Sequence, residues 1–458
     1  MIKKTLIAAL LCAAGTVHAA GEAKNVIFFL GDGMGPTTVT AARIYKYGET
    51  GALNMESLRR TARIKTFSND AQTTDSAPSM SAYMTGVKMN NEVVSMSSDT
   101  VAKAPAADGS STCPATGNGT PVTTLLELSK AAGKAVGAVT TTRVTHATPA
   151  ATYAHICHRD AENDIAAQAV PGGVGYNAAL KDGLDVLMGG GRRHFLPKAN
   201  GGKRIDGRDL VTELKTAGYT YADTGTALAA IDTSKTSKLV GLFHMDHLDY
   251  ELDRVKKNLD QPSLATMTTK AIDVLAKNQK GFFLMVEGGR IDHALHGTNA
   301  KRALEDAVAF DDAIKAALDA MQAKDPGLKN TLIVVTADHD HTMTINGYSK
   351  RGNPILDISR SYKDNTPNLD ADGNTYTTLV FGNGPTRKDV RTSIVSGAAD
   401  ATQALHDDYL QETGVRMGSE THGGGDVMLM SAGAGNAGFK GTMDNTKVFG
   451  LVRSALGL

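Results

Sequence analysis

The sequence predicts an α/β fold, with a doubly wound, mostly parallel central sheet flanked by helices. Short, unbroken apolar runs indicate this class, because strands buried on both faces show no polar alternation. Between these runs lie segments with apolar residues at three-to-four spacing, as expected for helices that pack on a sheet. Each run also ends at acids, a histidine or threonines. In such sheets a ligand binds outside the carboxyl ends of the strands.

Four apolar runs are the expected strands, and they span residues 25–30, 135–139, 282–286 and 331–335. The side chains that follow them are, in order, Asp32, a threonine-rich stretch leading to His146, Glu287, and the pair Asp338-His339. The expected helices cover residues 124–132, 264–277 and 301–321.

Residues 346–420 differ in composition from the rest of the chain. They contain scattered Gly, Pro, Asn and Asp, one strand-like run at 375–381 and short helical patterns around 400–409. We therefore expect an inserted subdomain rather than part of the central sheet. The stretch 370–374 superficially resembles a calcium loop. It lacks the later bidentate glutamate and the correctly placed glycine, so a turn is the better interpretation.

The composition excludes several classes of protein. The chain has 458 residues, 41% of them hydrophobic, with 48 basic and 48 acidic residues. A chain with this apolar content can build a sizeable core, so we do not expect a disordered protein. The balanced charge disfavours a nucleic-acid binder that depends on bulk positive charge, and no nucleic-acid-binding module is expected.

Residues 1–19 have the layout of a secretory signal peptide: Lys3 and Lys4, then an apolar stretch, then small residues at a cleavage site near Ala19/Ala20. The apolar stretch is shorter than the ~20 residues that a spanning helix needs. An N-terminal anchor and a lipid on Cys12 are the alternatives. We expect a mature chain of residues 20–458 that is periplasmic or secreted and does not bind a membrane.

Removal of this leader leaves two cysteines, Cys113 and Cys157. In an oxidising compartment such a pair suggests one disulfide. The sequence does not report the distance between the two thiols, so a disulfide and two free cysteines both remain open. Zinc binding by so sparse a pair is not expected.

A set of acids and histidines has the character of metal ligands. Asp292 and His296 lie four residues apart, so on a helix they share one face. Asp338 and His339 are adjacent, His341 follows them, and His422 begins a glycine-rich stretch. Taken singly, each would more often be a surface or capping residue. Together, at strand ends and beside glycines, they suggest zinc in an open, catalytic site.

Ser76 lies at the expected start of a helix, because Pro78 suits a first helical turn. Backbone N–H groups at that position favour an anion. An ordinary N-cap serine is the alternative. No Gly-x-Ser-x-Gly motif surrounds Ser76, so we expect metal coordination rather than a histidine base to activate it. The nearby stretch 31–35 lacks the spacing of a phosphate loop, and Asp32 within it is better interpreted as a metal ligand.

Four longer motifs resemble the signature segments of the alkaline phosphatase family. They are Thr74-Asp75-Ser76-Ala77, the stretch 286–293 (Val-Glu-Gly-Gly-Arg-Ile-Asp-His), Thr336-Ala337-Asp338-His339, and Thr421-His422-Gly423-Gly424. They occur in the order of the family, and the resemblance runs from Asn25 to near Ala432. Several independent motifs make the match specific.

This resemblance implies an exported hydrolase that converts phosphate monoesters to inorganic phosphate and an alcohol. It implies a phosphoserine intermediate, two zinc ions, one magnesium ion and a homodimer. Ser76 matches the nucleophile, and Arg159 matches the guanidinium that binds phosphate. The metal ligands that carry over are Asp292, His296 and His422 for the first zinc, Asp32, Asp338 and His339 for the second, and Asp32, Thr148 and Glu287 for magnesium.

At two substrate-binding positions the sequence departs from the enterobacterial pattern. His146 and His293 stand where that pattern has aspartate and lysine, and both match the animal and marine bacterial branches. The change bears on magnesium affinity and on the pH optimum. The insertion at 346–420 resembles the crown of those branches. Their calcium-binding glutamate does not carry over, because His244 follows Leu242-Phe243.

Two other functions fit parts of this pattern. A phosphodiesterase, pyrophosphatase or sulfatase of the same superfamily resembles the zinc scaffold, but usually carries threonine or a modified cysteine as nucleophile and lacks the magnesium ligands. A non-catalytic metal- or phosphate-binding protein would need the ligands and Arg159 but no nucleophile.

Overall fold

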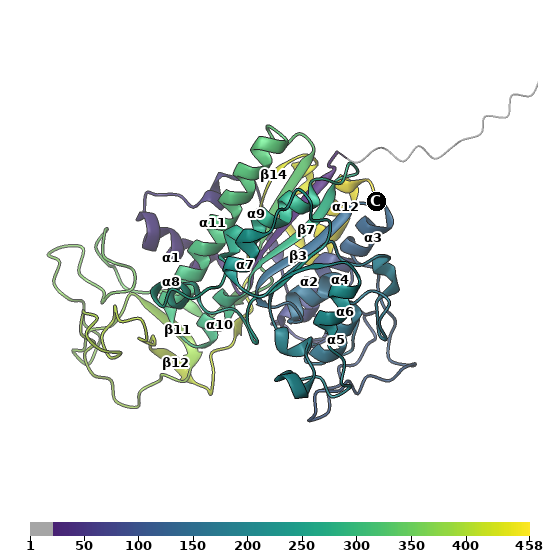
Figure 1. Ribbon diagram of the computed structural model, residues 1–458. Helices are drawn as coiled ribbons and strands as arrows, with labels where there is room; N and C mark the ends of the chain where they lie inside the picture. The colour runs from purple at the N-terminus through teal and green to yellow at the C-terminus, as the bar shows by residue number, and fades with distance from the viewer. Residues whose placement is uncertain (1–21) are drawn as a thin grey trace, which may run out of the picture.

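A ten-stranded sheet forms the centre of the protein in the computed structural model, which describes residues 22–458 (Figure 1). Among the described strands of this sheet, only β14 runs antiparallel to its neighbours. The predicted fold, a mostly parallel α/β sheet, is confirmed. In spatial order the strands are β15 (Gly441–Asp444), β2 (Arg60–Lys65), β14 (Val427–Gly433), β8 (Thr331–Thr336), β1 (Asn25–Gly31), β7 (Phe282–Gly288), β3 (Ala135–Arg143), β4 (Val186–Gly190), β6 (Leu239–Leu242) and β5 (Thr220–Ala222).

The four predicted strands are the four at the middle of the sheet, β8, β1, β7 and β3. Their apolar side chains are buried on both faces. The register places Leu30 of β1 beside Glu287 of β7 on one side and Thr336 of β8 on the other. Because these strands are parallel, the polar residues that follow them meet at one edge of the sheet.

Helices cover both faces of the sheet (Figure 1). One layer contains α1 (Pro36–Tyr47), α8 (Glu251–Lys256), α9 (Leu264–Leu275), α10 (Arg290–His296) and α11 (Ala300–Lys324). The other contains α2 (Ser76–Thr85), α3 (Leu125–Ala131), α4 (Ala147–Tyr153) and α12 (Asn445–Leu456). The shorter helices are α5 (Glu162–Gln168), α6 (Leu210–Thr216) and α7 (Gly225–Ala230). The three predicted helices correspond to α3, α9 and α11.

The segment expected as an insertion carries two strands, β11 (Leu379–Gly384) and β12 (Thr413–Arg416). With β10 (Met343–Ile345), which directly precedes the segment, they form a separate three-stranded sheet at one end of the molecule (Figure 1). Four side chains of the segment form a small apolar core of their own: Ile358, Ile394, Ala404 and Tyr409.

Two details of this segment were wrongly predicted. Residues 400–409 form turns rather than helix, because Asp400 accepts the N–H and hydroxyl of Thr402 in a local turn. The strand β11 begins at Leu379, later than the run at 375–381 suggested. The stretch 370–374, by contrast, is a turn, as predicted. In this turn Asp370 accepts from the N–H groups of Asp372 and Asn374.

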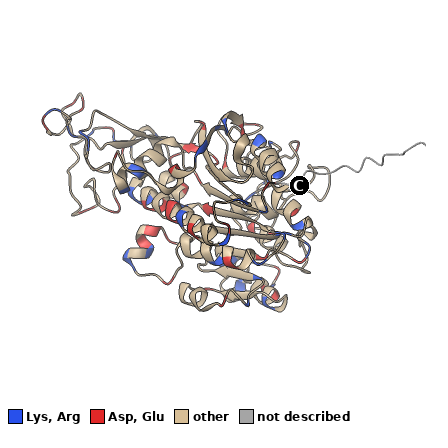
Figure 2. Cartoon of the chain, turned by 90° about the horizontal axis from the view of Figure 1, so that it is seen from above, with Lys and Arg blue, Asp and Glu red and all other residues tan. Residues whose placement is uncertain are grey.

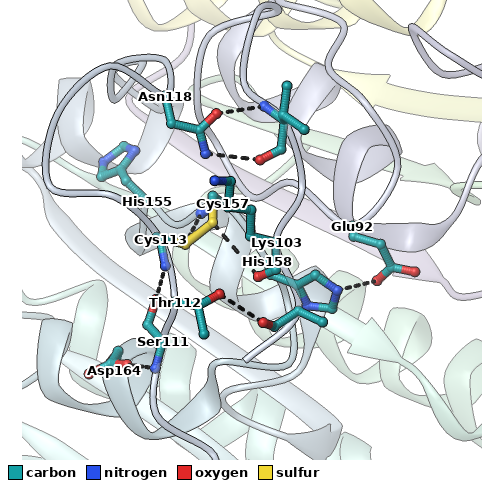
Figure 3. Close-up of a disulfide and its surroundings, with 12 residues drawn as sticks. Glu92, Lys103, Ser111, Thr112, Cys113, Asn118, His155, Cys157, His158 and Asp164 are labelled. Atoms are coloured by element: carbon teal, nitrogen blue, oxygen red, sulfur yellow. Dashed lines mark hydrogen bonds and ion pairs between the residues drawn. A yellow bond between two sulfur atoms is a disulfide. The ribbon is translucent and has the colours of Figure 1, made fainter. Parts of the chain in front are cut away.

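Cys113 and Cys157 form a disulfide, with their Cα atoms 5.7 Å apart (Figure 3). Of the two arrangements left open by the sequence, the structure has the bonded one. The disulfide fastens a long surface segment to the chain just before Arg159. The backbone N–H of Arg159 in turn donates to the carbonyl of Glu92.

The predicted signal peptide, residues 1–19, lies outside the described residues. Within residues 22–458 no helix has the length and apolar character required to cross a bilayer. Basic and acidic positions are interspersed over the helices rather than gathered by sign (Figure 2).

Asp306 is a buried carboxyl group in the middle of α11, with 5% of its surface exposed. It accepts the backbone N–H of Glu251 at 3.2 Å. Burial raises the pKa of Asp306 to about 8. In the unfolded chain the same carboxyl group has a pKa of ~3.9. It is therefore protonated in the folded protein at pH values where the unfolded chain has released this proton.

We predict that Asp306→Asn makes the protein more stable at pH 8 than the unchanged chain, and by less at pH 5. A raised folded-state pKa means that the folded protein binds more protons than the unfolded chain. Stability therefore falls as pH rises from about 4 to about 8. The amide removes this dependence and still accepts from Glu251. Thermal unfolding at both pH values measures the difference in stability between the variant and the unchanged chain. Asp319→Asn, on the exposed face of α11, is the control. An equal effect at both pH values would contradict the prediction.

Candidate active site and metal centre

Ser76 is the first residue of α2, at the edge of the sheet where β1 and β8 end. The helix is capped by Asp75, whose side chain accepts the N–H of Ala77 at 2.7 Å, so Ser76 itself is not the N-cap. The hydroxyl of Ser76 lies 3.2 Å from Nε2 of His339 and 3.4 Å from Oδ1 of Asp32. The serine thus faces a cluster of acids and imidazoles with its hydroxyl free of the capping role.

The three residues predicted for the first metal converge on one point. Nε2 of His296 lies 3.1 Å from Nε2 of His422 and 3.3 Å from Oδ1 of Asp292. Nε2 of His422 lies 3.4 Å from the same carboxylate oxygen. Helix α10 supplies Asp292 and His296 from one face, as their spacing predicts. His422 lies on the two-residue strand β13 (His422–Gly423).

The hydrogen bonds of these two imidazoles turn both Nε2 atoms toward one point. Nδ1 of His296 donates to the carbonyl of Glu420 at 2.6 Å, and Nδ1 of His422 donates to the carbonyl of Thr74 at 2.8 Å. Each neutral ring therefore carries its proton on Nδ1 and a lone pair on Nε2. Two lone pairs and a carboxylate oxygen that face one another repel unless a metal ion lies among them.

The second predicted group, Asp32, Asp338 and His339, is equally compact. Nε2 of His339 lies 3.4 Å from Oδ1 of Asp32 and 3.4 Å from Oδ2 of Asp338. All three side chains are buried, and Oδ2 of both aspartates lacks a hydrogen-bond partner among the described residues. Burial, then the charges of Asp338, Asp292 and Glu287, raises the pKa of Asp32 well above its usual value. These buried acids outnumber the positive charge that Arg159 supplies nearby, and so they indicate a cation site.

The predicted magnesium ligands lie on the other side of Asp32. Glu287 is the penultimate residue of β7, Thr148 lies in α4, and both are fully buried. Oγ1 of Thr148 and Oε1 of Glu287 have no partner within residues 22–458. His146 joins this group, since one donor atom each from Asp32, His146 and Glu287 could surround a single ion. Burial raises the pKa of Glu287 to about 7.

Arg159 and two histidines form the wall beside Ser76. Arg159 donates to Oδ1 of Asp75 at 3.1 Å and to Nε2 of His146 at 3.0 Å. Nδ1 of His293 accepts from Arg290 at 2.9 Å. Burial lowers the pKa of His293 to about 3 and lowers that of His146, which also lies beside the cations Arg159 and Arg143. Both imidazoles are therefore uncharged at neutral pH.

Two residues at the site lie outside the three ligand sets: His341, which was predicted as a candidate ligand, and Glu420, which was not. Nε2 of His341 lies 2.8 Å from Oδ1 of Asp292, and Nδ1 lies 2.6 Å from Oε2 of Glu420. His341 thereby holds the carboxylate of Asp292 in place. Both residues lie two positions from a predicted ligand, His339 and His422, and this spacing was the available signal.

A cavity of about 630 Å³ opens onto this cluster. Its lining includes Asp75, Asn91, His296 and His422. A substrate can therefore approach, from solvent, the point where the donor atoms of Asp292, His296 and His422 meet. The arrangement has the parts required to bind an anion and transfer it to a serine: a hydroxyl, a guanidinium and cation sites on the same edge.

Comparison with known proteins agrees with this geometry. Residues 23–458 match the family model described as alkaline phosphatase. The tissue-nonspecific alkaline phosphatase of Rattus norvegicus is 40% identical over 443 residues, covering 90% of this chain and 79% of the relative. The membrane-bound alkaline phosphatase of Bombyx mori is 36% identical over 476 residues, covering 95% of this chain and 80% of the relative.

A solved structure shares the whole architecture. The alkaline phosphatase of Thermus thermophilus superposes with a TM-score of 0.70 at 27% identity, covering 98% of this chain and 96% of that one. The family model spans nearly all the described residues, and the identity to the animal enzymes extends over most of the chain. The chain therefore belongs to the alkaline phosphatase family, on its animal-type branch, and is a phosphoric monoester hydrolase.

Proposed function

We propose that the protein is an exported, metal-dependent alkaline phosphatase that hydrolyses phosphate monoesters through a phosphoserine at Ser76, with two zinc ions and one magnesium ion. One observation carries this proposal. The donor atoms of Asp292, His296 and His422 lie 3.1–3.4 Å from one another, beside a cavity that His296, His422 and Asp75, the residue before Ser76, help to line. Imidazole and carboxylate ligands without cysteine suit a catalytic zinc.

The proposed metals are held by three sets of residues: Asp292, His296 and His422 for the first zinc, Asp32, Asp338 and His339 for the second, and Asp32, Thr148 and Glu287 for magnesium. When bound, these ions supply the positive charge that lowers the pKa of the Ser76 hydroxyl and stabilises the departing alkoxide. The shared ligand Asp32 couples the second and third sets.

The side chains position the phosphate and provide the nucleophile. Arg159 binds two phosphate oxygens with its planar guanidinium, which Asp75 holds in place. Ser76 attacks phosphorus, so that its Oγ–P bond forms as the bond to the ester oxygen breaks and the alcohol leaves with a proton. Water then cleaves the phosphoserine, releasing inorganic phosphate and restoring the hydroxyl. His293 donates from Nε2 to a phosphate oxygen.

Hydrolysis of p-nitrophenyl phosphate tests the activity. The purified protein is assayed across pH after chelation and after addition of zinc, magnesium or both. We expect no turnover after chelation, recovery that needs zinc, and a further gain with magnesium. Full activity in chelator would overturn the metal-dependent mechanism.

The nearest rival is a diesterase of the same superfamily. A monoester and a diester of p-nitrophenol carry the same leaving group, so their kcat/KM values compare the phosphate alone. Ser76 together with Glu287 and Thr148 favours the monoester. A larger kcat/KM for the diester would favour the rival.

His146 is expected to set the magnesium affinity of the third site. We predict that His146→Asp strengthens magnesium binding on the order of tenfold, because a carboxylate is a harder ligand than imidazole. The new carboxylate also attracts Arg159, so KM should rise. Calorimetric titration with magnesium measures the first effect. His146→Asn is the uncharged control, and equal magnesium affinity in both variants would contradict the prediction.

Export, dimerisation and the crown are further parts of the proposal. The Cys113–Cys157 disulfide supports an oxidising compartment, periplasmic or extracellular. Residues 346–420, proposed as the crown-like insertion, expose apolar side chains such as Tyr348 and Val390, which supports a homodimer that covers them. N-terminal sequencing of the mature protein tests cleavage near Ala20, and light scattering tests the dimer.

A further inference from the structure

His247 is a third imidazole at the substrate wall, and no predicted site includes it. Its ring centre lies 4.3 Å from that of His293 and 5.3 Å from that of His146. The planes are inclined at 64° and 80°, in edge-to-face contacts. His247 is thus the common neighbour of both histidines beside the phosphate position.

The loop after β6 carries His247, and its backbone hydrogen bonds fix the position of this side chain. It crosses the carboxyl end of β4, where the N–H of Gly191 donates to the carbonyl of Asp246 at 2.8 Å. A Cβ atom on Gly190 would lie 2.1 Å from that carbonyl oxygen, so only glycine permits the crossing. On the other side of His247, the N–H of Leu248 donates to the carbonyl of Thr141 at 3.0 Å. The loop is therefore fastened to β3 and β4 on both sides of His247.

The nitrogen atoms of His247 are engaged by Arg143. Nδ1 accepts the backbone N–H of Arg143 at 3.2 Å, and Nε2 contacts the guanidinium of the same residue. Because Nδ1 accepts, the proton of the neutral ring lies on Nε2, which is 3.7 Å from Oδ1 of Asp246. Arg143 is itself held by Glu162 and Asp246. His247 therefore meets His293 and His146 as a ring whose position is held by Arg143.

His293 and His146 each have a single side-chain hydrogen bond of their own. Nδ1 of His293 accepts from Arg290, which leaves N–H on Nε2. Nε2 of His146 accepts from Arg159, which leaves N–H on Nδ1, a buried atom without a partner among the described residues. One hydrogen bond fixes one atom of a ring but not its plane. The plane sets where the remaining N–H points.

We infer that His247 is a positioning residue for phosphate recognition: it fixes the ring plane of His293, so that the free N–H of His293 points to the phosphate. The inference rests on the proposed function of His293 in substrate binding. It predicts that loss of the ring weakens phosphate binding while the two proposed zinc groups, which do not include His146, keep their ions.

The test uses the metal-loaded full chain and inorganic phosphate as the probe. His247→Ala should raise KM for p-nitrophenyl phosphate and the inhibition constant of phosphate by about tenfold, with a smaller change in kcat and unchanged zinc content. His247→Phe, which keeps a ring against His293, should restore most of the loss. His244→Ala, in the same loop, is the matched control and should change the inhibition constant less than about twofold.

A double-mutant cycle then separates positioning from a general disturbance. In a His293→Ala background, His247→Ala should add little, because the ring that it positions is gone. Additive losses, an unchanged inhibition constant in His247→Ala, or an equal loss in His244→Ala would each overturn the inference. If the unchanged protein hydrolyses no monoester, the proposed function fails instead, and calorimetric binding of phosphate to the same variants still decides the role of His247.

Discussion

The Ser76→Ala variant is expected to lose phosphomonoesterase activity by about 10³-fold or more while its zinc content is unchanged. Ser76 supplies the one protein atom that forms a covalent bond to phosphorus in the proposed reaction. The hydroxyl lies 3.2 Å from Nε2 of His339, yet the ligand atoms of the proposed second metal belong to Asp32, Asp338 and His339. Removal of one oxygen thus eliminates the nucleophile and leaves the metal ligands.

Two measurements check this expectation. Turnover of p-nitrophenyl phosphate is compared with metal analysis of the same samples. In addition, acid quenching during turnover should leave a phosphate group on the Ser76 peptide, detected by mass spectrometry. Ser81→Ala is the matched control, since Ser81 is buried in the same helix and bonds to Ser95 away from the metal groups. Near-normal turnover of Ser76→Ala would remove the covalent mechanism.

The central sheet could be predicted from the sequence because its strands are apolar on both faces. The runs at 25–30 and 331–335 have no other plausible place than the interior of a layered fold, and both are interior strands. Strand β2, by contrast, alternates charged and apolar residues at the side of the sheet, and nothing in 60–65 marked it as part of the layer. Strands β9 (Asp340–His341) and β13 are too short to show any pattern.

The candidate site was predictable where its residues follow strands or lie at helical spacing. Asp32, Glu287 and Asp338 follow adjacent parallel strands, and the register of those strands brings them together. His247 gave no such signal, because it reaches the site from a loop that crosses β4 through contacts distant in sequence. Tertiary hydrogen bonds, not local pattern, decide the position of such a residue.

Asp32→Asn is expected to have the second large effect on activity. Its effect on the stability of the fold should change sign when the metals are removed. Asp32 belongs both to the group with Asp338 and His339 and to the group with His146 and Glu287. The amide is a weaker ligand than the carboxylate, so the second zinc and the magnesium should both be lost. The first zinc, on Asp292, His296 and His422, should remain. Activity should fall by about 10³-fold or more, because Ser76 loses the cation beside it.

Without metals the same substitution should stabilise the fold. Burial and the neighbouring acids Asp338, Asp292 and Glu287 raise the pKa of Asp32, which means that its negative charge is unfavourable in the metal-free protein. The amide removes that charge. The unfolding temperature of Asp32→Asn should therefore exceed that of the unchanged chain in chelator and fall below it in zinc and magnesium.

Metal analysis tests the loss of the two ions, and calorimetry on the same preparations tests the stability change with and without metals. Asp340→Asn is the matched control: its carboxylate lies on the same edge and accepts the N–H of His341 at 2.8 Å, outside the three ligand sets. It should retain all three ions. If Asp32→Asn kept the second zinc, the assignment of Asp32 as the shared ligand would be wrong. Asp32→Asn could also be less stable than the unchanged chain in chelator. The hydrogen bonds of Asp32 would then stabilise the metal-free fold by more than its buried charge destabilises it.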